Sequence, residues 1–163
     1  MQSISDDLYD EVFTIFVYSL WHGIKYTGMS AEQGSAENPW KLSTPAGTSE
    51  YTIHRAVKNG KAILVCTAGK TVLHYDARCI EDLYGMLKEY GDWVELGGTD
   101  EQKPVKEGTV EAWGRSPGNP IGGWYGLKKG LRGRFGVYIP PLLERLGLAE
   151  LEHKPKDNRM RAL

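Results

Sequence analysis

Hydrophobic side chains recur at helical spacing along residues 5–25, which begin with Ser5 and two aspartates. Ser5 can cap a helix, and acidic residues in the first turn interact favourably with the positive end of the helix dipole. The apolar positions cover most of the circumference of this expected helix, so it must be buried against its own domain or against a second chain. The sequence therefore predicts an N-terminal helix within residues 1–26 and leaves a homodimer through that helix as an open alternative.

The central part of the chain contains three short strand-like runs, YTIHRAV (51–57), AILVCT (62–67) and TVLHY (71–75). Asn59-Gly60 separates the first two runs, and this pair favours a two-residue hairpin turn. A second tight turn at Ala68–Lys70 follows, so the runs predict a three-stranded antiparallel meander. We expect its core face to carry Tyr51, Ile53, Leu64, Cys66, Leu73 and Tyr75.

A helix is expected after the meander, because Asp76 can cap it and apolar residues follow at helical spacing up to Gly91. The short apolar run WVEL comes next. Further along, the patterns TVEAW (109–113) and RFGVYI (134–139) predict strands. Pro140-Pro141 then opens a short helix that Gly147 stops, and the remaining tail predicts a hairpin.

These elements place the chain in the α+β class, with an N-terminal helix, an antiparallel β-meander with a helix, and a C-terminal unit of strand, helix and hairpin. Stretches rich in small, polar and turn-forming residues separate the three parts. We therefore expect an N-terminal helix at 1–26, a meander-plus-helix subdomain at 50–97 and a basic α+β subdomain at 108–163. A chain of 163 residues can form a core without a disulfide or a metal ion.

Positive charge is concentrated near the C-terminus. The whole chain has a net charge of -1, but residues 101–163 carry twelve lysines and arginines against seven acids, a net charge of +5. No acidic residue lies between Glu111 and Glu144. Such a region attracts nucleic acid, phosphate or an acidic partner, whereas a solvated face is the purely structural alternative. The sequence pI of about 6.4 is low for a free-standing nucleic-acid-binding protein.

Within this region, residues 122–141 interleave aromatic rings with cations and glycines. Cations neutralise phosphates and aromatic rings can stack on bases, so the segment predicts a small nucleic-acid-binding protein, with DNA as one target. Two alternatives stay open: a pocket for a small anion in the loop 115–134, in a ligand-binding protein or an enzyme, and an interaction module without chemistry. The candidate binding residues are Arg115, Trp124, Tyr125, Lys128, Lys129, Arg132 and Arg134.

The sequence contains no catalytic or metal-binding motif as clear as this basic segment. The segment AGKT (68–71) lacks the first glycine of a P-loop, and a strand-like run follows it where a P-loop has a helix. His54 and His74 are expected on one sheet face but two strands apart, about 9–10 Å, which is too far to share a metal ion. Cys79 is expected to be buried on the apolar side of its helix, without an identifiable base. We therefore expect no metal and no cofactor, and we identify no catalytic residue.

The chain also lacks export and membrane signals. Its start has no cationic region, and the run VFTIFVYSLW is far shorter than the roughly 18 residues of a membrane span. Two cysteines without zinc-ligand spacing suit reduced thiols. We expect a cytoplasmic protein that does not enter the membrane.

The C-terminal residues 133–163 resemble the AbrB-type swapped-hairpin DNA-binding module, in which a basic strand ending in Ile-Pro precedes a short helix, Leu-Gly-Leu and a hairpin. Arg134, Ile139-Pro140 and Leu146-Gly147-Leu148 match this order, while Ala149-Glu150 stands where that family has Gly-Asp. The resemblance implies an intertwined dimer with DNA contacts from Lys128, Lys129, Arg132 and Arg134.

A second resemblance covers most of the chain. The runs PWKLSTPAGTSEY, GDWVELG and EGTVEAWGRSPGNPIGGWYGL are similar to an uncharacterised bacterial family over residues 38–163. This resemblance implies no activity, and the first 33 residues would be an addition to the family pattern.

Overall fold

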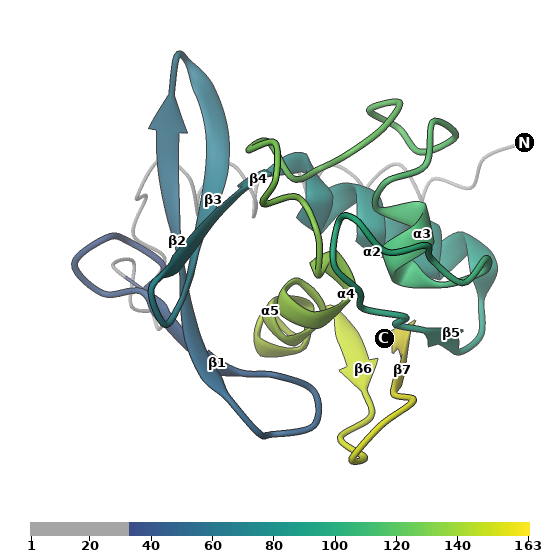
Figure 1. Cartoon of the computed structure of the whole chain (residues 1–163). Helices are drawn as coiled ribbons and strands as arrows, with labels where there is room; N and C mark the ends of the chain where they lie inside the picture. The colour runs from purple at the N-terminus through teal and green to yellow at the C-terminus, as the bar shows by residue number, and fades with distance from the viewer. Residues whose placement is uncertain (1–32) are drawn as a thin grey trace, which may run out of the picture.

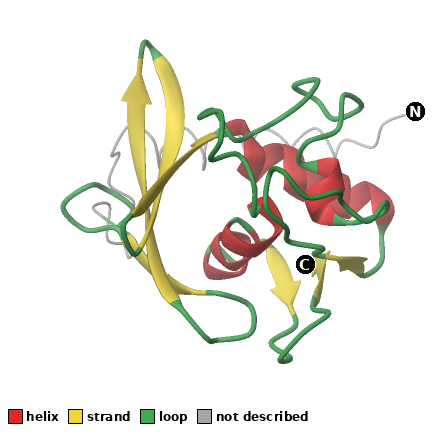
Figure 2. Cartoon of the chain, viewed as in Figure 1, coloured by secondary structure: helices red, strands yellow, loops and turns green. Residues whose placement is uncertain are grey.

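The computed structural model describes residues 33–163, so the predicted N-terminal helix and the homodimer through it lie outside the described residues. The described chain forms a four-stranded sheet and a three-stranded sheet. In Figures 1 and 2 the larger sheet is curved and its concave side faces the short helices in the centre, with the longest helix and the smaller sheet beyond them. This combination of antiparallel sheets and helices confirms the α+β class. Within the described range, no helix is long and apolar enough to cross a membrane.

The four-stranded sheet is antiparallel with the order β1-β2-β3-β4. Its strands are β1 (Trp40–Ser43), β2 (Glu50–Lys58), β3 (Lys61–Ala68) and β4 (Thr71–Asp76). The last three confirm the predicted meander, and positive φ angles at Asn59 (53°) and Gly60 (74°) fit a type I′ turn at the predicted two-residue loop. β1 is an addition, because it lies in a stretch where the sequence predicted only a connection, and it includes Trp40 and Leu42. Both side chains are buried.

One face of this sheet supplies much of the core. The register pairs Ile53 with Cys66 and Cys66 with Leu73, so alternate side chains of three strands point the same way. The six residues predicted for the core face are all buried: Tyr51, Ile53, Leu64, Cys66, Leu73 and Tyr75. Burial also raises the pKa of the Cys66 thiol to about 12, so this cysteine stays protonated.

Helix α2 (Arg78–Tyr90) follows β4 as predicted. Asp76 Oδ1 accepts a hydrogen bond from Arg78 N (3.0 Å), and Gly91 ends the helix with a φ of 73°. Cys79 is fully buried, and burial raises its pKa well above the usual value, which confirms the packing interpretation of this thiol. The buried stripe of the helix is Cys79, Ile80, Leu83, Tyr84 and Leu87.

Two predicted strands are wrong. Residues 109–113 contain the short helix α3 (Val110–Trp113), because Thr109 Oγ1 accepts a hydrogen bond from Ala112 N (3.1 Å) as an N-cap. Residues 134–139 contain the short helix α4 (Phe135–Tyr138). Phe135 and Ile139 are four residues apart, so a helical turn buries both of them on one side. The basic strand that the AbrB-type module requires is therefore absent from this segment.

The predicted C-terminal helix and hairpin are both present. Helix α5 (Pro140–Arg145) begins with two prolines, and Gly147 follows its end with a φ of 75°. Strands β6 (Ala149–Leu151) and β7 (Arg159–Ala162) form the terminal hairpin. The short strand β5 (Val94–Glu95), from the WVEL run, pairs with β7 and completes a sheet of order β5-β7-β6.

A hydrophobic cluster connects the two sheets and the helices. Residues of both 50–97 and 108–163 contribute to it, and β5 of the first segment pairs with β7 of the second. The division of these segments into two subdomains stays a prediction. At the centre of the cluster the ring of Phe135 lies 5.9 Å from that of Tyr75 and 5.5 Å from that of Tyr125, between ring centroids. Elements far apart in the sequence are thus fixed against one another.

Candidate functional site

The acidic loop, which we define as residues 99–103, lies against the arginines of the predicted binding segment. Arg134 Nε lies 2.7 Å from Asp100 Oδ1, and this hydrogen-bonded ion pair lowers the pKa of Asp100. Arg132 Nε lies 3.9 Å from Glu101 Oε1. Two of the candidate cations are therefore already paired with carboxylates of the same chain.

Arg115 is held more tightly, since its side chain is only 10% exposed. Its Nη atoms approach four carbonyl oxygens of the acidic loop at 3.2–3.5 Å, and Nη2 lies 3.5 Å from Glu111 Oε1. Glu111 is 1% exposed, and the same oxygen accepts a hydrogen bond from Thr99 N (2.9 Å). Burial raises the pKa of the Glu111 carboxyl. Arg115 thus links the backbone of the acidic loop to Glu111 in α3 through hydrogen bonds and an ion pair.

Trp124 lies next to two of these arginines. The guanidinium carbon of Arg115 is 4.3 Å from its ring centroid, and that of Arg132 is 6.0 Å away. Both are cation–π contacts, which are favourable but use ring surface that a stacked base would need. The structure therefore brings Arg115, Trp124 and Arg132 together as one packed group.

Tyr125 belongs to the core. Its side chain is fully buried, and its hydroxyl donates a hydrogen bond to Asp82 Oδ2 (2.8 Å). Its ring stacks on Trp113 at a centroid distance of 5.3 Å and on Phe135 at 5.5 Å. The structure therefore places Tyr125 inside the core, with both its ring and its hydroxyl in contact with other residues of the chain.

The two candidate lysines are placed differently. After Tyr125 the chain runs along the edge of β4, where Leu127 N donates a hydrogen bond to His74 O (2.8 Å). This pairing places Lys128 beside His74. Lys128 and Lys129 are exposed, and neither forms an ion pair with any residue of 33–163. These two cations remain available to a ligand.

His54 and His74 lie on the sheet face opposite the core, because both pair with Val65 across β3. This confirms the predicted arrangement on one face, two strands apart. Lys58 points to the same face, since it is four residues after His54 on β2. The pKa of His74 is lowered first by partial burial and then by the charges of Lys58, Lys128 and His54. We call the lysine–histidine surface the set His54, Lys58, His74 and Lys128, together with the exposed Lys129, which follows Lys128 in the chain.

Sequence reasoning identified only part of this surface. It named Lys128 and Lys129, but it left Lys58 out and gave no binding role to the histidines. The register that placed His54 and His74 on one face could also have placed Lys58 there, because Lys58 is four residues after His54 on the same strand. The roles of the three arginines, Trp124 and Tyr125 as ligand contacts stay predictions, and the lysine–histidine surface does not require them.

Metal ligation receives no support from residues 33–163, where no group of three or more His, Cys, Asp or Glu side chains could hold a metal ion. The two thiols of the chain, Cys66 and Cys79, are free and buried. Neither is placed to act as a ligand or a nucleophile.

Comparison with known proteins gives a family and no activity. No curated protein and no solved structure matches the chain. A family model matches residues 32–163, which agrees closely with the range 38–163 over which the sequence resembles an uncharacterised family. The chain therefore belongs to the family of unknown function DUF6855.

Proposed function

We propose that the protein binds nucleic acid through the lysine–histidine surface. The observation that supports this most is the gathering of cationic side chains on one sheet face, where Lys58 and Lys128 both act on the pKa of His74. None of the three lysines forms an ion pair with a described residue. Affinity for nucleic acid comes mainly from such free cations, because each one neutralises a phosphate and releases a counterion.

The arrangement suits an extended polyanion better than a single small anion. The members of the surface come from β2, β4 and the segment after Leu127, and the two histidines are about 9–10 Å apart at normal strand spacing. In contrast, the cavity of about 350 Å³ beside Arg134 is also lined by Asp100 and Glu101, which repel an anion. No observation on residues 33–163 favours an enzyme or a non-catalytic interaction module over this function.

Salt dependence of binding tests this proposal. In fluorescence-anisotropy titrations with labelled duplex DNA and single-stranded RNA, we expect the affinity to fall as salt rises. On duplex DNA, the log-log slope should be about -0.9 per phosphate neutralised. Changing Lys128 and Lys129 together to alanine removes two free cations, so it should make the slope shallower by about two and weaken binding to all sequences alike.

The matched control is Lys156→Ala, because Lys156 is an exposed lysine in the turn between β6 and β7, outside the lysine–histidine surface. It should leave the salt slope unchanged. The proposal is wrong if the unmodified protein binds neither nucleic acid in a salt-sensitive way at low salt. It is also wrong if Lys156→Ala weakens binding as much as Lys128→Ala does.

A further inference from the structure

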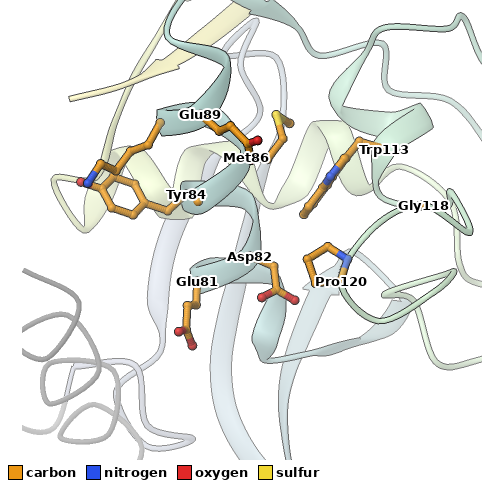
Figure 3. A pocket seen from close by; sticks show the side chains of 10 residues that line it. Glu81, Asp82, Tyr84, Met86, Glu89, Trp113, Gly118 and Pro120 are labelled. Atoms are coloured by element: carbon orange, nitrogen blue, oxygen red, sulfur yellow. The ribbon is translucent and has the colours of Figure 1, made fainter. Parts of the chain in front are cut away.

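A cleft of about 620 Å³ lies between α2 and the loop that follows α3. In Figure 3, Asp82 and Met86 of α2 face Trp113 and Pro120 across this cleft. Glu89 lies on the same side of the helix, seven residues after Asp82. The cleft shares no residue with the lysine–histidine surface.

The middle of the cleft is apolar and its two ends are acidic. Met86 and Trp113 supply facing apolar walls, and the indole of Trp113 is fixed in place by stacking on Tyr125 with an angle of 24° between the rings. Asp82 and Glu89 stand at the two ends, and their separation of seven residues corresponds to about 10 Å along the helix axis. This pattern calls for a ligand with a cation at each end and an apolar middle.

Both carboxylates keep capacity for such a ligand. Asp82 Oδ2 accepts a hydrogen bond from Tyr125 (2.8 Å) and lies 3.5 Å from Arg78 Nη2, whereas Oδ1 has no bond from a described residue. Glu89 is exposed and forms no ion pair within residues 33–163. The lysine that borders the cleft, Lys88, lies over the ring of Tyr84 at 5.7 Å, and Tyr84 points away from Trp113 in Figure 3.

Gly85 gives independent support, because it lines the cleft from the interior of α2. Glycine is the poorest helix former except for proline. A Cβ at this position would meet no atom of residues 33–163 within 4 Å, so close packing against them does not explain the glycine. Its effect is to keep this side of the cleft open.

We propose that the cleft binds an aliphatic diamine or polyamine, with one ammonium group at Asp82, another at Glu89 and the methylene chain against Met86 and Trp113. Carboxylates form charge-assisted hydrogen bonds with ammonium groups, and the indole ring attracts cations. An extended eight-carbon diamine spans about the distance between the two ends, whereas putrescine is roughly half as long. This site is independent of the nucleic-acid proposal.

Isothermal titration calorimetry of the full chain with diaminooctane, spermidine, putrescine and octylamine tests the proposal. Diaminooctane and spermidine should bind most tightly, because their end ammonium groups reach both carboxylates. Octylamine and putrescine reach only one of them, so they should bind at least about two- to fivefold more weakly, the effect of losing one exposed ion pair.

Three variants of the chain extend this titration experiment. Gly85→Leu fills the cleft and should abolish diaminooctane binding without lowering the melting temperature, because leucine is a better helix former than glycine. Glu89→Gln should weaken binding about two- to fivefold, since an exposed ion pair is worth little. Glu50→Gln is the matched control, an exposed acid on β2 outside the cleft, and it should have no effect.

Three results would overturn the proposal: diaminooctane fails to bind, octylamine binds as tightly as diaminooctane, or Gly85→Leu binds like the unmodified chain. If Gly85→Leu lowers the melting temperature, the chain-length series and Glu89→Gln decide. In that case, equal affinities for diaminooctane and putrescine, or an unchanged affinity of Glu89→Gln, count against the site.

Discussion

Replacing Glu111 with alanine is expected to lower the free energy of unfolding by about 3 kcal/mol. The change leaves the buried guanidinium of Arg115 without its counter-charge and Thr99 N without its acceptor. Burial already disfavours the ionised carboxyl, as the raised pKa of Glu111 indicates. The loss therefore arises from the groups left unpaired rather than from a strong ion pair. Urea unfolding measures it directly.

Two further variants serve as comparisons for Glu111→Ala. Glu111→Gln keeps an oxygen acceptor for Thr99 N but no charge for Arg115, so its stability should fall between those of Glu111→Ala and the unmodified chain. Glu107→Ala changes an exposed acid and should alter the free energy by less than about 0.5 kcal/mol. A Glu111→Ala variant as stable as Glu107→Ala would show that this buried pair does not hold the acidic loop.

Gly133→Ala is expected to lower the free energy of unfolding by about 2–3 kcal/mol. A Cβ on Gly133 would lie 2.8 Å from Asp100 C and closer still to Glu101 N. These are backbone atoms, so no flexible side chain can move aside, and the acidic loop would have to shift. Gly133 O also accepts a hydrogen bond from the buried hydroxyl of Tyr75 (3.1 Å), which opposes movement of the glycine itself. Thermal unfolding reports the loss as a lower melting temperature.

The matched control for this change is Gly123→Ala. In the part of the chain that the structure describes, no atom lies within 4 Å of a Cβ at Gly123, and its φ is not positive. Alanine there should raise stability by about 0.4–1 kcal/mol, because it restricts the unfolded chain. Equal melting temperatures for the Gly133 and Gly123 variants would contradict the close approach of the acidic loop to the basic segment.

The elements predicted correctly are those in which the local pattern and the tertiary contacts agree. In β3 the predicted core residues Leu64 and Cys66 are buried, and the Asn59-Gly60 turn fixes the register with β2. The helices α3 and α4 have only four residues each, too few for periodicity to distinguish a helix from a strand. Distant contacts decide their conformation. One example is Gly136, whose missing Cβ allows the backbone of α4 to approach Leu96 O.

In the candidate site, too, some features could be predicted from the local sequence and others depend on contacts between distant residues. The cations of the basic segment are visible in the sequence, but their partners are not, since Asp100 lies 34 residues before Arg134 and meets it only in the folded protein. Counting cations therefore overestimates the charge that a ligand would meet. Conversely, Lys58 joins Lys128 only through the strand register and the pairing of Leu127 with His74.

The pKa of His74, followed by NMR with and without a bound oligonucleotide, tests the lysine–histidine surface most directly. In the free protein, partial burial and the charges of Lys58, Lys128 and His54 lower this pKa below the usual histidine value. Phosphates at the surface would favour the charged imidazolium, so we predict that the pKa of His74 rises on binding. By linkage, the affinity for the oligonucleotide should then increase as the pH falls through the pKa of His74. A pKa of His74 that stays unchanged at saturating oligonucleotide would contradict nucleic-acid binding at this surface.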